Sequence, residues 1–197
     1  MFLARRPSQR TIDRLLEASR DLPLSYAPVG ILNGPGSLRY LDEVTVAIGQ
    51  GKGDFERARA ALIEWRQFDL GWVELFPKSA PIAAGTLVLV LIRHLGFWSL
   101  NGCRVVYTIE PADEPRFGLA YGTVTNHAES GEELFEVFMD SRSGDVMYRI
   151  RATSRPRALL AHIGQPIVRG LQSRFRRDSV ASMKRATGAS LSRSAPR

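Results

Sequence analysis

Apolar and polar side chains alternate along much of the second half of this chain. Segments near 103–110, 117–125, 133–140 and 145–153 repeat apolar residues at every second position, which is the period of a half-buried strand. Residues 86–94 are largely apolar at consecutive positions and predict a strand covered on both faces. The alternation assigns to one inner face Cys103, Val105, Tyr107, Ile109, Phe117, Leu119, Tyr121, Thr123, Phe135, Val137, Met139, Val146, Tyr148, Ile150 and Ala152.

Other stretches complete the set of expected elements. Helical spacing at 8–20 and 55–67 predicts two amphipathic helices, and strands are expected at 40–48 and 70–76. A longer apolar stripe predicts a C-terminal helix, with Leu160, Ile163, Ile167, Leu171 and Phe175 on one side. Pro166 would kink that helix or split it in two.

The order of these elements predicts the fold class. A strand, a helix, a run of antiparallel strands and a long C-terminal helix indicate an α+β protein. The apolar face of the sheet must be covered, and the C-terminal helix is the long amphipathic element left to cover it. A curved sheet and a straight helix cannot match everywhere, so a cavity is expected between them. We predict a curved antiparallel sheet of about six to seven strands wrapped around that helix, as a single domain over residues 1–187.

One connection between two predicted strands is unusually apolar. We place a loop at residues 96–102, yet it carries Phe97, Trp98 and Leu100, whereas solvent-facing hairpin loops are normally polar. Such side chains either tuck under the body or face a ligand, a membrane or a partner. Phe97 and Trp98 could gate a pocket or simply plug the end of the sheet.

Three glycines at alternate positions precede the helix at 55–67, in the stretch GQGKGD. Backbone N–H groups at a helix N-terminus bind anions, so this stretch could cradle a phosphate. Its spacing matches neither of the common phosphate-loop patterns. We favour a tight turn in which Asp54 caps the following helix.

Composition narrows the class of protein. With 197 residues, 44% hydrophobic and 24% charged, the chain is typical of a globular domain. Its single cysteine, Cys103, excludes an internal disulfide and CxxC-type metal sites. The N-terminus lacks the apolar stretch of a secretory signal, and the longest apolar run, 87–92, is too short to span a membrane. We expect a soluble, cytoplasmic protein.

Positive charge is concentrated at the C-terminal end. Residues 151–197 hold eleven Lys and Arg against one acidic residue, Asp178, a balance of +10, while the remainder carries −3. A basic segment attracts nucleic acid or anionic lipid. The simpler interpretation, which we favour, is a solvated helix face followed by a disordered basic tail at 188–197.

The pattern resembles the helix-grip superfamily (START-like, SRPBCC, birch-pollen-allergen-like), whose members bind lipids, sterols or polyketides; some are cyclases or hydrolases. A closer resemblance is to a domain-of-unknown-function family, number nineteen-ninety, of bacteria and plants. It rests on FLARRPS, LPLSYAPVG, FDLGWVEL, RHLGFWSLNGCRVVY, FGLAYGT, SRPRALLAHIG and QSRFRRDS. The segment around Glu43 and Thr45 departs from the family pattern, in which a basic residue is usual there. This resemblance implies the fold and no reaction.

Candidate catalytic residues are His94, Cys103 and Tyr107. A reactive thiol needs a nearby cation or base, which Arg93 or His94 could supply, although an inert buried cysteine is the commoner case. Arg93 and His94 fall on opposite faces of one strand. An inward Arg93 would favour an acidic ligand, because an unpaired buried charge is not tolerated. His127 and its neighbouring glutamates are too exposed to hold a metal, so we expect neither a metal nor a cofactor.

Three inward tyrosines indicate a pocket with polar spots, because buried hydroxyls need partners. The expected ligand-binding residues are Arg93, His94, Trp98, Asn101, Tyr107, Tyr121 and Tyr148. The leading hypothesis is a module that binds a small hydrophobic or amphipathic molecule between the sheet and the C-terminal helix. The alternatives are a cyclase- or hydrolase-like enzyme using the same cavity, and a protein whose basic surface binds nucleic acid or an anionic membrane.

Overall fold

The computed structural model describes residues 2–33, 41–127, 129–156 and 161–188. Its strands are β1 (Phe2–Leu3), β2 (Leu41–Gln50), β3 (Val73–Phe76), β4 (Leu87–His94), β5 (Phe97–Ile109), β6 (Arg116–Thr123), β7 (Glu129–Met139) and β8 (Asp145–Pro156). Its helices are α1 (Gln9–Ala18), α2 (Gly51–Ile63) and α3 (Ala161–Thr187), with two short 3-10 helices, η1 (Ile31–Asn33) and η2 (Arg66–Phe68). The predicted tail lies outside the described residues except for Gly188.

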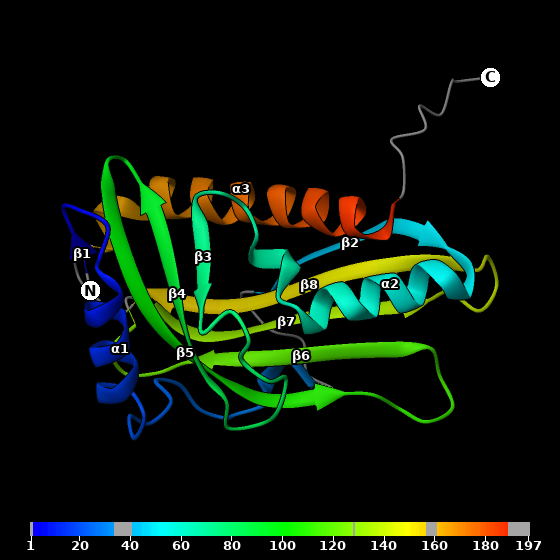
Figure 1. Ribbon diagram of the computed structural model, residues 1–197, viewed down its shortest axis with the longest axis horizontal. Helices are drawn as coiled ribbons and strands as arrows, with labels where there is room; N and C mark the ends of the chain where they lie inside the picture. Colours follow the sequence, from blue (N-terminus) through cyan, green and yellow to red (C-terminus); the bar gives the residue numbers. More distant parts are fainter. Residues whose placement is uncertain (1, 34–40, 128, 157–160, 189–197) are drawn as a thin grey trace.

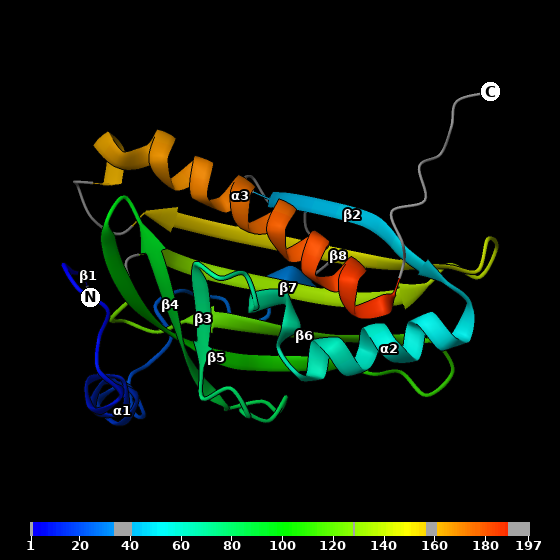
Figure 2. The ribbon, with the colours of Figure 1, turned by 45° about the horizontal axis from the view of Figure 1, so that its top comes forward.

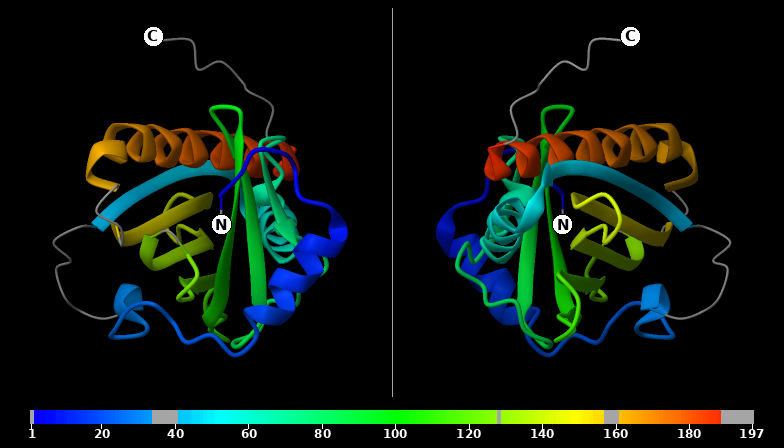
Figure 3. Two further views of the ribbon diagram at one scale, coloured as in Figure 1. Left: turned by 90° about the vertical axis from the view of Figure 1, so that its left-hand side faces the viewer. Right: turned by 90° about the vertical axis from the view of Figure 1, so that its right-hand side faces the viewer.

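The strands form one antiparallel sheet in the order β2-β8-β7-β6-β5-β4-β3, with the short β1 paired to β5 (Figure 1). From β3 to β8, strands that follow each other in the chain are neighbours, whereas β2 lies at the far edge beside β8. The sheet curls, so that α3 lies across its open side when the molecule is viewed along its long axis (Figure 3). The predicted architecture, a curved antiparallel sheet of six to seven main strands around a C-terminal helix, is confirmed.

The apolar connection between β4 and β5 is mostly strand, which corrects the predicted loop at 96–102. The register pairs Arg93 with Trp98 and His94 with Phe97, leaving only Leu95 and Gly96 in the turn. Both turn residues have positive φ, 48° and 80°, as the commonest two-residue hairpin turns require. The apolar side chains are therefore strand residues that pack on the faces of the sheet.

Two helices cover the concave face. Helix α3 contacts α2, η2, β2 and β8, and Figure 2 shows its second half beside α2. It runs unbroken from Ala161 to Thr187, so the predicted split at Pro166 is wrong, and Leu160 of the predicted stripe lies outside the described residues. None of the described helices is long and apolar enough to cross a bilayer.

The inner face predicted by the alternation is largely confirmed. Buried side chains of all the long strands meet α2 and α3 in one core, including Cys103, Val105, Phe117, Leu119, Tyr121, Phe135, Val137, Val146, Tyr148 and Ile150. Phe68 of η2 lies in the middle of this core, with its ring centroid 5.4 Å from that of Phe135 and 5.4 Å from that of Phe175 on α3. This aromatic contact joins sheet and helix.

Tyr107 and Ile109 do not share that inner face. The register between β5 and β6 shifts between Val105 and Tyr107, and such a bulge reverses the side-chain alternation beyond it. Tyr107 and Ile109 instead pack on the outer face, against a cluster that contains Leu32. The prediction that three tyrosines point inward is therefore wrong for Tyr107.

The outer face is covered by the segment that leads from α1 to η1. Glu132 of β7 is buried there and accepts hydrogen bonds from the Tyr26 hydroxyl (2.6 Å) and from the backbone N–H groups of Gly30 (2.8 Å) and Leu32 (3.2 Å). The Tyr26 ring lies so close to β6 that a Cβ on Gly122 would be 2.3 Å from its hydroxyl oxygen. One carboxylate thus fastens a long loop to the sheet.

The glycine-rich stretch is the start of α2. Asp54 accepts a hydrogen bond from the backbone N–H of Gln50 at 2.7 Å, and Gly51 has φ of 77°. The carboxylate therefore caps the helix in its first turn. The predicted capping role of Asp54 is thus supported, but the helix begins at Gly51 and not near residue 55, so Gly51 and Gly53 lie in its first turn rather than in a turn before it.

Candidate functional site

The concave face is apolar in one part and polar in another. Under α2 and the second half of α3 it is filled by aliphatic and aromatic side chains, and the Tyr148 hydroxyl pairs with Ser179 of α3 at 2.9 Å. Toward the first half of α3, the inner positions of β5, β6 and β7 carry polar groups instead. They are Ser99, Asn101, Tyr121, Thr123, Glu129 and Glu133.

A hydrogen-bonded pair lies at the centre of this polar part. Tyr121 and Glu133 are opposite each other on β6 and β7, and the Tyr121 hydroxyl donates to Oε2 of Glu133 at 2.6 Å. The Tyr121 ring is 5.6 Å from that of Phe135, so the pair borders the aromatic core. A phenol and a carboxyl group are thereby held together at the edge of an apolar interior.

Burial changes the acidity of both groups. It is the largest cause of a pKa of about 7 for Glu133; the carboxylates of Glu129 and Asp42 also raise this pKa, while the Tyr121 hydrogen bond and Arg176 lower it. Burial also raises the pKa of Tyr121, so the phenol keeps its proton at neutral pH. Glu133 consequently changes its charge near neutrality, which is unusual for a carboxyl group.

This shift predicts that stability falls as the pH rises from about 4.5 to about 7. In that window folded Glu133 keeps a proton that the unfolded chain has released, so the free energy of unfolding decreases with pH. We expect the loss to reach about 2 kcal/mol, allowing for partial exposure of the side chain. Urea unfolding at about pH 5 and about pH 8 measures it.

The variant Glu133→Gln isolates the contribution of this carboxyl group. It should match the wild type near pH 5 and exceed it in stability near pH 8, because the amide has no charge to desolvate. Glu114→Gln, at an exposed loop position, should keep the wild-type pH profile. Identical profiles for Glu133→Gln and the wild type would contradict the assignment.

Two side chains one turn apart on α3, Gln172 and Arg176, reach this polar part. Nε2 of Gln172 lies 3.4 Å from Oε1 of Glu129 on β7 and 3.4 Å from the hydroxyl of Ser154 on β8. Burial raises the pKa of Glu129 as well. In the described part of α3, Gln172 thus makes long polar contacts beside Leu171 and Phe175, which pack on the core, and Met183 is buried nearer the end of the helix.

The residues expected from the β4–β5 hairpin are divided between the two faces. Arg93 is exposed on the outer face, with its guanidinium 5.8 Å from the Trp98 ring, and Trp98 packs toward α1. Phe97 is 54% exposed at the inner edge, beside His94. Burial lowers the pKa of His94. Arg93 and Trp98 thus point away from the concave face, so an inward Arg93 cannot be the reason to expect an acidic ligand.

The remaining candidates have separate roles. Cys103 is buried on the concave face, and burial raises the pKa of its thiol, so it lacks the thiolate character of a nucleophile. Asn101 is buried nearby and donates to the Ser99 hydroxyl at 3.2 Å. Tyr107 lies on the other face. The structure therefore does not bring His94, Cys103 and Tyr107 together around one open space.

Two polar residues of the interior were missed from the sequence. Glu133 precedes Phe135 and Val137 at alternate positions of the same strand. The alternation could therefore have identified it as an inward-facing residue. Gln67 of η2 is completely buried, and neither of its amide atoms has a hydrogen-bond partner among the described residues. No periodicity marks a residue in a single 3-10 turn, so Gln67 could be found only from the structure.

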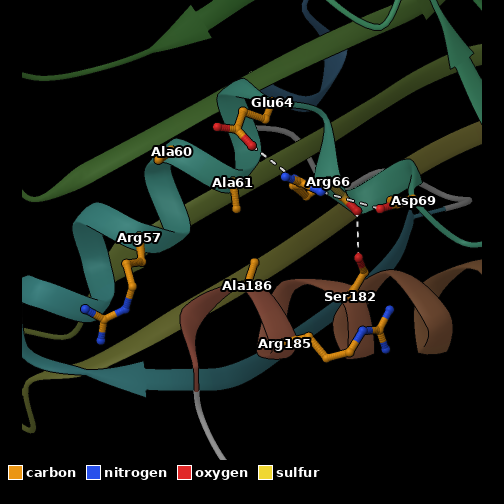
Figure 4. Close-up of a pocket in the computed structure, with 9 residues that line it drawn as sticks. All are labelled: Arg57, Ala60, Ala61, Glu64, Arg66, Asp69, Ser182, Arg185 and Ala186. Atoms are coloured by element: carbon orange, nitrogen blue, oxygen red, sulfur yellow. Dashed lines mark hydrogen bonds and ion pairs between the residues drawn. The ribbon is translucent and has the colours of Figure 1, made fainter.

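A hollow of about 470 Å³ lies between α2 and the end of α3 (Figure 4). Alanines line its middle, and the guanidinium groups of Arg57 and Arg185 point in opposite directions at its edges. Ser182 donates to the Arg66 carbonyl at 2.7 Å, which ties α3 to η2. This hollow, and a second of about 440 Å³ beside the β5–β6 loop, lie away from the Tyr121–Glu133 pair. Among the described residues, no group of three His, Cys, Asp or Glu is arranged to hold a metal.

Comparison with known proteins places the chain among uncharacterised relatives. Residues 25–182 match the family model described as a domain of unknown function, DUF1990. A UPF0548 protein of Dictyostelium discoideum is 33% identical, covering 95% of this chain and 96% of the relative. A UPF0548 protein of Deinococcus radiodurans is 34% identical, covering 95% of this chain and all of the relative.

Solved structures support the architecture at low identity. A Thermus thermophilus protein, TTHA0849, superposes with a TM-score of 0.54 at 11% identity, over 77% of this chain and 99% of that one. The Zhui aromatase/cyclase of a Streptomyces species gives 0.52 at 10% identity, over 75% and 93%. These likenesses concern the helix-grip fold alone.

Proposed function

Because this chain belongs to the DUF1990 family and has the helix-grip fold, we propose that it binds a small amphipathic molecule between the concave face of the sheet and the first half of α3. The observation that carries the proposal is the polar part of the concave face. Tyr121, Glu133 and Asn101 face inward at the border of an aromatic core. A packed structural core favours apolar residues there, whereas a ligand site needs a few convergent polar groups among apolar ones.

The contacts along the described part of α3 support the same location. Its second half is fastened by buried contacts, such as the Thr187 hydroxyl on the carbonyl of Ile48 at 2.6 Å. The contacts of Gln172 nearer the other end are longer, 3.4 Å and 3.5 Å to the Glu129 carboxylate. Local opening follows the weakest contacts. A molecule could therefore enter beneath the first half of α3 while the second half keeps the fold intact.

The two alternatives have less support. An enzyme using His94, Cys103 or Tyr107 requires them around one space, and they are separated as described above. A basic interaction surface has the excess positive charge of residues 151–197 behind it, but part of that charge is paired, Arg174 with Asp178 at 3.4 Å and Arg176 with Asp42. Surface arginines already neutralised by carboxylates contribute little to the attraction of polyanions.

The proposal predicts that filling the concave face abolishes binding. Ala152 of β8 lies opposite Glu133 on the inner face. Replacing it with tryptophan should lower the affinity for the neutral dye Nile red at least tenfold (about 1.4 kcal/mol). Ala112→Trp, in the exposed β5–β6 loop, is the matched control and should bind as the wild type does.

Fluorescence titration gives the affinities, and native mass spectrometry of freshly purified protein looks for a bound guest. Thermal unfolding shows whether Ala152→Trp is folded. Equal dye affinity for the two folded tryptophan variants would refute binding at this face.

A further inference from the structure

The charges of the interior suggest what kind of ligand it accepts, an inference that rests on the proposed function. Among the described residues around the Tyr121–Glu133 pair, the charged groups are Glu129, Glu133, Arg176 and, at the rim, Asp42. The Arg176 guanidinium is paired with the Asp42 carboxylate. Glu129 and Glu133 thus leave the polar part acidic. A carboxylate ligand would meet like charges in a poorly solvated space.

Glu133 has one oxygen available to a ligand. Its Oε2 accepts the Tyr121 hydroxyl, and no group among the described residues donates to its Oε1. A carboxylate has lone pairs for several donors, and bonds to charged donors are the strongest it makes. Tyr121 also fixes the orientation of the carboxyl group. The geometry therefore presents a pre-oriented acceptor toward the concave face.

Gln67 is a second and independent sign that the interior expects a polar guest. It is 0% exposed, and both its Nε2 and its Oε1 lack partners among the described residues. The next residue, Phe68, has its ring 6.0 Å from the Tyr121 ring, so the turn that carries Gln67 borders the same interior. Buried amides are almost always hydrogen-bonded, to protein, to ordered water or to a ligand. A polar atom of a bound molecule, or an ordered water, would complete this carboxamide.

We propose that the ligand is an amphiphile whose polar end is a protonated amine, bound by Oε1 of Glu133. The apolar remainder lies in the surrounding core, and a second polar atom carried on it pairs with the amide of Gln67. An ammonium group would supply the opposite charge that Glu133 lacks, and would hold it ionised. The groups that face Glu133 are Tyr121, Glu129, Arg176, Asp42, Cys103 and Tyr148.

Three probes with one chain length test the proposal: dodecylamine, 1-dodecanol and dodecanoate, each below its micelle concentration. Displacement of Nile red from the full-length protein near pH 8 gives the affinities, and native mass spectrometry counts the bound molecules. We expect dodecylamine to bind at least tenfold more tightly than dodecanoate. Glu133→Gln should remove most of that preference and leave 1-dodecanol within about twofold, while Glu114→Gln should change none of the three.

The outcomes separate the two proposals. If none of the probes displaces the dye or is seen in the mass spectrum, binding at this face is wrong. If dodecanoate binds as tightly as dodecylamine, or if Glu133→Gln keeps the preference, binding stands and the amine assignment is wrong.

A second variant tests the part assigned to Gln67. Gln67→Met removes the unpaired amide at similar volume, so the ligand-free protein should melt at the same or a higher temperature. Dodecylamine has no second polar atom and should bind as before, whereas the affinity for 12-amino-1-dodecanol should fall severalfold. A lower melting temperature with unchanged affinity for the amino alcohol would mean that water satisfies Gln67 and that it does not touch the ligand.

Discussion

Replacing Phe135 by alanine is expected to lower the free energy of unfolding by about 3–5 kcal/mol. Phe135 is 0% exposed at the centre of the concave face. Its ring packs against Phe68 of η2 and Phe175 of α3 at centroid distances of 5.4 Å and 6.1 Å, both edge-on. Its strand is paired on both sides, so the backbone cannot move in to close the cavity. Urea unfolding at fixed pH measures the loss.

Phe97→Ala is the matched control for this substitution. It deletes the same atoms from a ring that is 54% exposed beside the β4–β5 turn, so we expect a loss below about 1 kcal/mol. The difference between the two losses in unfolding free energy then measures how much the Phe135 ring contributes to holding the sheet, η2 and α3 together. Equal losses would mean that Phe135 does not hold these elements together.

The second large effect is expected on the outer face. Glu132→Gln should cost about 3 kcal/mol, because this buried carboxylate accepts from Tyr26, Gly30 and Leu32. An amide offers one oxygen and turns an NH₂ group toward donors that have no other acceptor, which leaves buried polar groups unpaired. Since burial and Glu132 together raise the pKa of the Tyr26 phenol, that hydroxyl keeps its proton to donate.

The site of the damage distinguishes this effect from a general loss of stability. Hydrogen exchange at the Gly30 and Leu32 amides should accelerate more than exchange in the β6–β7 pairing. Glu114→Gln, whose carboxylate is 60% exposed and 3.9 Å from Arg116, should change stability by less than about 0.5 kcal/mol. Uniform acceleration in Glu132→Gln would show that this carboxylate does not fasten the loop specifically.

Much of the architecture could be predicted because burial has a period. In β8 the apolar residue at every second position is the one that the structure buries, as Val146, Tyr148 and Ile150 illustrate. Most of β6 and β7 is buried on both faces, so the alternation there identifies only which side chains share the inner face. The stripe of α3 could be recognised in the same way, and Leu171 and Phe175 do pack on the core. Whether such a residue is buried depends on which face of its strand or helix it occupies, and the spacing of apolar residues in the local sequence indicates that face.

The failures occur where one residue changes the geometry of its neighbours. The bulge after Val105 moves Tyr107 to the outer face, and the positive φ of Leu95 shortens the hairpin turn to two residues. Neither a bulge nor a turn of this kind has a strong signature at these positions. The prediction that Arg93 and Trp98 bind the ligand fails for the same reason. Which face of the sheet they occupy depends on the register of β4 with β5, and only the structure shows that register.

The sequence by itself determined the class of fold, the elements on which the sheet and its covering helix are built, and most of the side chains between them. Only the tertiary structure decided which polar groups meet in that interior. Tyr121 and Glu133 are 12 positions apart along the chain yet share a hydrogen bond of 2.6 Å, and Gln67 is left without a partner among the described residues by the way η2 is packed. Burial of apolar side chains adds up residue by residue, so the spacing of apolar residues along the chain is enough to predict it. A hydrogen bond forms only when the fold brings two particular atoms within reach of each other.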